Sequence, residues 1–313
     1  MARRAREAQS AATKAQRRAT REKLGRLRDQ QVHPRTLRRY RRHVQEFYRW
    51  IDHTGREIPG TVTEFDTVLC AWAAHLWAEG DAKSILNNGL CGLAHFVPAL
   101  RGQLYGVWRL YRAWSRAEKP VQAPPMVKVM AQAFAGWFES EGHPGAATMI
   151  LVAFHCILRT NEFFELRTGD VSTSGRGLLL QLRDTKIGQR LGIHQEVALT
   201  NPWLCRRVRE AVRAAGAGHT LLGMTPYHFR RRWALARVAL RASTRYTPYS
   251  LRRGGATAWF QYCGSFDKVA DKGRWQTAAA TRQYITTALL EVASEDILSS
   301  MGEFLRRYAN RLA

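Results

Sequence analysis

A short proline-containing segment divides the chain into two parts. The sequence AEKPVQAPP, residues 117–125, contains three prolines and shows no hydrophobic periodicity. Proline lacks a backbone N–H and fixes its own φ angle, so such a run resists helix and sheet and is typical of a linker. The 313 residues are enough for one large domain or two ordinary ones. We therefore expect two domains, one on each side of this segment.

The net charge indicates an anionic polymer as partner. The sequence carries a formal charge of +24, and the excess of Lys and Arg is spread along its entire length. Such a balance favours nucleic acid over a membrane surface. The chain also lacks a run of about 18 uninterrupted apolar residues, so we expect no membrane span.

The cysteines and histidines show no metal-binding pattern. The five cysteines are scattered and none forms a CxxC pair, and the ten histidines lack ligand spacing. We therefore expect free thiols in a reducing compartment and no zinc site.

The N-terminal end predicts a solvated arm. Residues 1–28 hold ten Lys or Arg side chains against two Glu, with almost no large apolar residue. Such a segment cannot bury a core, and we expect residues 1–29 to be a basic arm that becomes helical on a phosphate backbone. A nuclear address and a plain basic tail are equally compatible with this composition.

The region between the arm and the linker predicts a helical bundle. Apolar side chains recur at helical spacing in four segments, as Leu37, Val44 and Ile51 do in the first. No strand pattern interrupts them, so we expect residues 30–116 to form an all-helical domain with a basic outer face. Its basic outer face supplies the candidate DNA-binding residues Arg38, Arg41 and Arg42.

The region after the linker, residues 126–313, predicts a mainly helical domain with a small sheet. An apolar helix is expected over residues 147–158, and helical patterns return after Pro202. Two strands are expected between them, because leucines alternate at 178, 180 and 182 and apolar residues recur at 197 and 199. The sequence DTKIGQRLG between these strands predicts a basic hairpin tip.

Four places in this second domain combine functional side chains with an apolar framework. LRTNEFFELRTGDV places Glu162 one helical turn after Arg159, and Lys186 lies in the expected hairpin tip. YTPYSLRRGGATAWF places Tyr249 three residues before Arg252, and GRWQTAAATRQYI places Trp275 nine residues before Tyr284. Taken singly, each has a plain structural explanation, such as a surface ion pair or a packing aromatic. Arginines near a helix N-terminus oppose the helix dipole, however, which indicates a strongly anionic ligand.

Together, the four motifs resemble those of the tyrosine recombinase (phage integrase) family. The order Arg, Lys, x-x-Arg, Trp, Tyr is similar to that family's, and the resemblance covers about residues 126–290. It implies an N-terminal helical core-binding bundle followed by an α+β catalytic domain. There are departures: Tyr249 stands where the family usually has a His, and Arg274 stands where a Gly usually precedes the third motif.

The resemblance also implies a role for each site residue. Tyr284 is expected to be the nucleophile, with Arg159 and Arg252 stabilising the transition state. Lys186 is expected to protonate the departing 5′ oxygen, and Trp275 to offer its indole N–H to the phosphate. Tyr249 is expected to orient the phosphate or Tyr284, and Glu162 to hold Arg159. Further DNA contacts are expected from the remaining arginines near these motifs, namely Arg190, Arg231, Arg253 and Arg274.

The function implied is that of a site-specific recombinase or integrase of a mobile element, working on double-stranded DNA through a 3′-phosphotyrosine. No metal and no cofactor are expected. A non-cleaving DNA-binding protein of the same fold and a type IB topoisomerase are the alternatives. The segment after Tyr284 is apolar enough to dock into a neighbouring protomer of a tetramer, or to form an ordinary intramolecular helix. A eukaryotic host would imply the nucleus, and any other host the cytoplasm or nucleoid.

Overall fold

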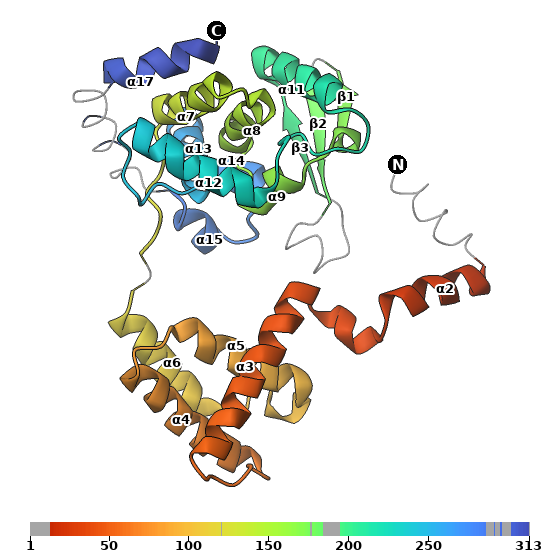
Figure 1. Ribbon diagram of the computed structural model, residues 1–313, viewed down its shortest axis with the longest axis vertical. Helices are drawn as coiled ribbons and strands as arrows, with labels where there is room; N and C mark the ends of the chain where they lie inside the picture. The colour runs from red at the N-terminus through yellow and green to blue at the C-terminus, as the bar shows by residue number, and fades with distance from the viewer. Residues whose placement is uncertain are drawn as a thin grey trace. The chain divides into compact units, whose positions relative to one another are not determined.

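The division of the chain falls inside the proline-containing segment. The structure, a computed structural model, describes residues 13–119, 121–175, 177–183, 195–285, 291, 295 and 302–312. Two compact units, Met1–Val121 and Gln122–Ala313, make up the chain (Figure 1). Within the described residues, no helix is both long and apolar enough to cross a bilayer.

The first unit is a bundle of four helices that follows a basic segment. In that segment, α2 (Lys14–Leu24) buries none of its residues and is followed by η1 (Leu27–Gln31). The bundle contains α3 (Pro34–His53), α4 (Val62–Ala78), α5 (Lys83–Phe96), η2 (Pro98–Leu100) and α6 (Tyr105–Ala117). Its core includes the fully buried Phe47, Leu69 and Leu90. These helices match the four periodic segments of the sequence.

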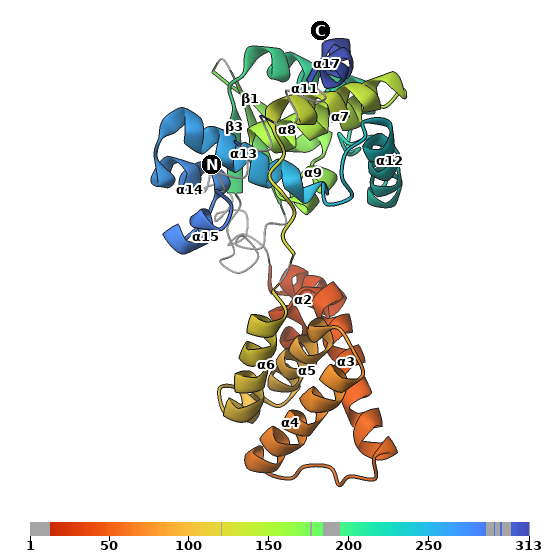
Figure 2. The same ribbon diagram turned by 90° about the vertical axis from the view of Figure 1, so that its left-hand side faces the viewer.

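The second unit is built around two apolar helices, α7 (Lys128–Ser140) and α8 (Pro144–His155). Further helices surround them: α9 (Thr160–Glu165), α11 (Pro202–Ala215), α12 (Pro226–Ala239), α13 (Tyr249–Cys263), α14 (Phe266–Gly273) and α15 (Ala278–Arg282). In Figure 2, α14 and α15 lie beside α13 at one edge of this unit. The elements that carry the Tyr249–Arg252 and Trp275–Tyr284 motifs are therefore neighbours in space.

A three-stranded antiparallel sheet with strand order β1-β2-β3 completes this unit. It follows η3 (Thr168–Asp170) and comprises β1 (Val171–Ser174), β2 (Gly177–Leu182) and β3 (Gln195–Leu199). Leu180 pairs with both Val171 and Val197, and alternate leucines of β2 are buried in the core. The predicted fold class, mainly helical with a small sheet, is confirmed.

The C-terminal end packs against a helix of the same unit. The helix α17 (Gly302–Ala309) and the following η4 (Asn310–Leu312) lie against α7 (Figure 1). A Cβ atom on Gly136 would come within 1.8 Å of the backbone oxygen of Tyr308, so this glycine allows the close approach. The described part of this segment forms an intramolecular helix, and docking into a neighbouring protomer stays a prediction.

Two glycines bring α13 against the backbone of other elements. A Cβ atom on Gly254 would lie 1.9 Å from the oxygen of Met126, and one on Gly255 would lie 2.1 Å from the oxygen of Phe154. The Met126 amide also donates a hydrogen bond to the Ser250 oxygen, at 3.1 Å. The glycines that weaken α13 as an isolated helix are therefore required by its packing.

Candidate active site

The turn between α8 and α9 holds the first arginine. The apolar helix ends at His155, three residues earlier than its sequence pattern predicts, and Ile157 adopts a left-handed conformation with φ of 52°. Arg159 is therefore the N-cap residue of α9, and its amide donates to Oε2 of Glu162 at 2.8 Å. Its Nη1 donates to Oε1 of the same carboxylate at 2.6 Å. The expected Arg159–Glu162 contact is present, and the Arg159 side chain is 24% exposed.

The second arginine, Arg252, is completely buried in the first turn of α13. Its Nη1 donates to the oxygen of Ile157, and its Nη2 donates to the oxygen of Gly273 at 2.7 Å. Burial, together with the nearby charge of Arg159, lowers the pKa of Arg252 to about 10, so the guanidinium stays protonated at neutral pH. A buried cation held by neutral carbonyls creates a strongly positive potential where it lies.

Two aromatic side chains cover this guanidinium. Its central carbon lies 4.4 Å from the ring centroid of Trp275 and 5.3 Å from that of Tyr284, within the range of cation–π contacts. The two rings lie 4.5 Å apart. The Trp275 ring occupies the space that a side chain on Gly273 would fill, since a Cβ there would come within 1.8 Å of the indole.

The hydroxyls of Tyr249 and Tyr284 form a hydrogen bond of 2.5 Å, with Tyr249 as donor. Burial alone would raise the pKa of Tyr284, but the Tyr249 hydrogen bond, the charge of Arg252 and a hydrogen bond from Trp275 together lower this pKa below its usual value. Burial and the same tyrosine pair raise the pKa of Tyr249. The arrangement therefore favours the anion on Tyr284 while Tyr249 keeps its proton.

Thr257 contacts the backbone of Tyr284. The Thr257 hydroxyl lies 2.9 Å from the oxygen of Arg253 and 3.2 Å from the backbone oxygen of Tyr284. The Tyr284 amide also donates to the oxygen of Thr281, at 3.0 Å. Thr257 lies within the motif YTPYSLRRGGATAWF, but the sequence alone assigned it no role.

The residues expected to contact DNA fall into three groups. Arg38, Arg41 and Arg42 on α3 and Arg231 on α12 are exposed. Arg253 is only 4% exposed and donates to Oε1 of Gln122, while Arg274 forms an ion pair with Glu162. Each of these last two arginines is therefore held by a partner distant in sequence, and their contact with DNA stays a prediction. Lys186 and Arg190 lie outside the described residues.

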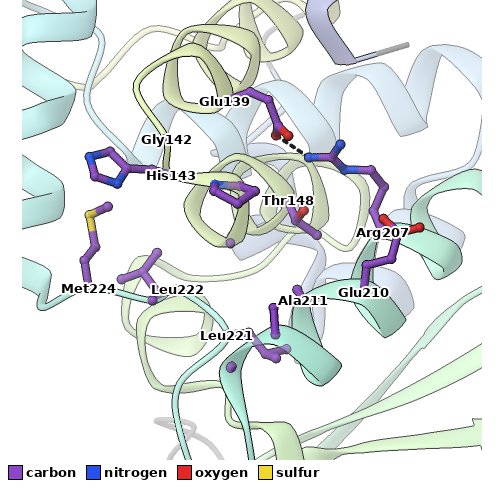
Figure 3. Close-up of a pocket in the computed structure, with 15 residues that line it drawn as sticks. Glu139, Gly142, His143, Thr148, Arg207, Glu210, Ala211, Leu221, Leu222 and Met224 are labelled. Carbon is purple, nitrogen blue, oxygen red and sulfur yellow. Dashed lines mark hydrogen bonds and ion pairs between the residues drawn. The ribbon is translucent and has the colours of Figure 1, made fainter.

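A separate cleft lies elsewhere in the second unit. Its volume is about 350 Å³, and its wall includes the Glu139–Arg207 ion pair, His143 and Thr148 (Figure 3). Leu221, Leu222 and Met224 also line it. None of the residues around Tyr284 lines this cleft, so it is not the centre that the motifs define. Among the described residues, no group of three or more His, Cys, Asp or Glu side chains could hold a metal ion.

Comparison with known proteins identifies the fold. No family model matches the chain, and no curated protein matches its sequence. A solved structure of a lambda integrase dimer bound to a COC′ core site is 14% identical with a TM-score of 0.58, covering 82% of this chain and 90% of that one. The Tn1549 transposon integrase in complex with circular intermediate DNA is 13% identical with a TM-score of 0.53, covering 82% and 98%. The chain has the fold of the tyrosine recombinases.

Proposed function

We propose that this chain is a site-specific DNA recombinase that cuts and rejoins DNA through a phosphotyrosine on Tyr284. The observation that carries the proposal is the grouping of a tyrosine of lowered pKa with a buried, charged Arg252 and the partly exposed Arg159. Solved structures with this fold include integrases bound to DNA. The chain's charge of +24 is consistent with the same partner.

The cleavage step forms one bond and breaks another at a single phosphorus. The Tyr284 oxygen, having lost its proton to solvent, attacks the phosphorus, and the bond to the 5′ oxygen breaks. That oxygen leaves as a hydroxyl by taking a proton, for which Lys186 is the proposed donor, and the phosphate remains on Tyr284 with its 3′ linkage. Rejoining reverses these steps, so the energy of the phosphodiester is conserved in the phosphotyrosine.

The two arginines suit the charge that develops in this step. The transition state spreads negative charge over the non-bridging oxygens, and fixed cations in a buried site stabilise it without reorganising. Arg252 is already held by two carbonyls and two rings before DNA binds. Tyr249 stabilises the attacking oxygen by its hydrogen bond, a role that requires no change in its own protonation.

The first unit is proposed to bind the DNA that the second unit cleaves. Its helix α3 presents Arg38, Arg41 and Arg42, and α2 is wholly exposed and basic. Contacts from such side chains reach phosphates and position the protein on the duplex. We propose that four copies of the chain act together on two DNA sites, since recombination exchanges strands between two duplexes.

The test is covalent trapping on a pool of duplexes with random central sequence, each carrying a 5′-bridging sulfur at one phosphodiester. The thiolate that leaves cannot efficiently attack the phosphotyrosine, so the adduct accumulates and its DNA can be sequenced. We expect one sequence to be enriched, and two copies of it on a plasmid to recombine. Adduct without sequence enrichment, together with relaxation of any supercoiled plasmid, would favour a topoisomerase. Absence of adduct would favour a non-cleaving DNA-binding protein.

A further inference from the structure

The residue that ends α14 has an unusual backbone for its type. Arg274 is the C-cap of this helix and lies in the left-handed region, with φ of 58° and ψ of 46°. A Cβ atom disfavours this conformation, and glycine adopts it readily. Only two other non-glycine residues in the described part of the chain have positive φ, and one of them is Ile157, in the turn before Arg159. Strained positions of this kind gather at functional sites.

The Arg274 side chain turns inward, toward the first arginine motif. Its Nη2 forms an ion pair with Oε2 of Glu162 at 2.6 Å and lies 3.5 Å from the oxygen of Ile157. Its Nη1 donates to the oxygen of Lys272 at 3.2 Å. The side chain is only 7% exposed and that of Glu162 only 3%, so this is a buried contact between residues 112 positions apart in sequence.

Glu162 is consequently shared between two arginines. One carboxylate oxygen binds the Arg159 guanidinium, and the other binds Arg274 and the Arg159 amide. Burial would raise the pKa of Glu162, but the charges of Arg274 and Arg159 outweigh burial and keep this pKa below its usual value. The shared carboxylate is therefore an anion with both of its oxygens held. It contacts the Arg159 guanidinium through one nitrogen, Nη1.

We infer that Arg274 is a positioning residue for strand cleavage, which holds Glu162 so that the carboxylate orients Arg159 toward the scissile phosphate. The inference rests on the proposed function, because it assigns a part in the same reaction. Arg274 also joins the turn that carries Trp275 to the turn that carries Arg159. Arg252 joins the same two turns through the oxygens of Ile157 and Gly273, so the two arginines together fix the separation of elements that must both contact the phosphate.

A direct DNA contact is the competing role for this arginine. The charge of Arg274 is already balanced by the Glu162 carboxylate, and its side chain is only 7% exposed. Arg252 is buried too, but neutral carbonyls hold it and leave its charge uncompensated, and the Arg159 side chain stays 24% exposed. The two roles also differ in what removal of the side chain does. Loss of a phosphate contact weakens binding and lowers the salt slope by about one, whereas loss of a positioning contact leaves binding intact.

The variant Arg274→Gly separates these roles, because glycine suits the backbone conformation at this position. Single-turnover cleavage is measured at saturating DNA on the duplex recovered by trapping, or on the random pool where no sequence is enriched. We expect the rate to fall about 10- to 100-fold, since small displacements of a positioning group have effects of this order. The dissociation constant and its salt dependence should stay within twofold of wild type, and Arg274→Lys should restore part of the rate.

Arg241→Gly is the matched control. Arg241 also has a positive φ, of 51°, but its guanidinium lies over the Phe304 ring and not at the site. Its cleavage rate should equal that of wild type. The double variant Arg274→Gly/Glu162→Gln should cleave only slightly more slowly than either single variant, because both changes break the same network of contacts.

The outcomes distinguish the two hypotheses. An unchanged rate in Arg274→Gly, with normal adduct formation by wild type, would overturn the positioning role and leave the proposed function intact. A rate loss that is matched by weaker binding and a smaller salt slope would assign Arg274 to DNA contact instead. Failure of the wild-type protein to form adduct would overturn the proposed function itself, and with it any role of Arg274 in cleavage.

Discussion

The chemical role of Tyr249 is set by its contact with Tyr284. Its hydroxyl is bonded to that of Tyr284, and its raised pKa makes it a poor proton carrier at neutral pH. We therefore expect Tyr249→Phe to slow cleavage by only about fivefold, the effect of one neutral hydrogen bond of about 1 kcal/mol. Tyr249→His should be tolerated, since an imidazole can also donate or move a proton. Single-turnover cleavage at fixed salt measures each rate.

Arg252→Ala is the comparison for those variants. It removes a buried, charge-assisted donor from the transition state and should cost on the order of 10²–10³ in rate. A loss in Tyr249→Phe as large as this would show that Tyr249 takes part directly in proton transfer.

The tyrosine pair also predicts a change in the pH profile. Cleavage requires the Tyr284 anion, so the rate rises with pH until the pKa of Tyr284 is passed. The Tyr249 hydrogen bond is the largest of the effects that lower this pKa, and its removal must raise the pKa. The inflection in log rate against pH should therefore move to higher pH in Tyr249→Phe. An inflection at the same pH in both proteins would mean that the pair does not control the nucleophile.

At the scale of single elements, α13 depends on its two glycines for packing. The backbone oxygen of Phe154 lies where a Cβ on Gly255 would be, so Gly255→Ala must displace α8 or α13. We expect a loss of about 1–3 kcal/mol in the free energy of unfolding, the usual effect of overpacking. Urea denaturation of the full chain measures this loss. Gly169→Ala is the control, because the atom nearest to a Cβ at this position is the end of the Arg183 side chain, at 3.8 Å. The free energy of unfolding of this variant should hardly change.

The connection between β2 and β3 carries the proposed general acid, Lys186, which lies outside the described residues. Lys186→Ala should slow cleavage of an ordinary phosphodiester by about 10²–10⁴-fold, the usual contribution of a general acid. The same variant should cleave the 5′-bridging sulfur substrate almost as fast as wild type, because a thiolate leaves without a proton. Equal defects on both substrates would show that Lys186 does not protonate the leaving group.

Element by element, the sequence predicted what repeats locally and missed what depends on distant contacts. Helical periodicity located α3 to α6, and alternating leucines located β2. The strand β1 went unpredicted because VSTS has no apolar alternation and three of its four residues are exposed. The burial of Arg253 and Arg274 could not be predicted either, since their partners Gln122 and Glu162 lie more than 100 residues away.

At the scale of the whole molecule, charge is expected to dominate affinity. If about eight phosphates are neutralised, log K should fall against log salt with a slope of roughly −7. Deleting residues 1–28 removes ten cations and should flatten this slope, as fluorescence anisotropy over a salt series would show. Replacing the same residues with a neutral Gly/Ser segment controls for length. A slope that survives both changes would mean that the arm does not touch DNA.

Tyr284 is proposed to be the nucleophile, and covalent trapping identifies the residue that carries the DNA. The sulfur-bridged duplex pool is incubated with wild type, Tyr284→Phe and Tyr262→Phe, and the adducts are digested and mapped by mass spectrometry. Tyr262 lies on the same unit but is 81% exposed, so its variant is the control. We expect adduct on Tyr284 in wild type and in Tyr262→Phe, and none in Tyr284→Phe, which should still bind DNA. Full adduct formation by Tyr284→Phe would show that another residue is the nucleophile.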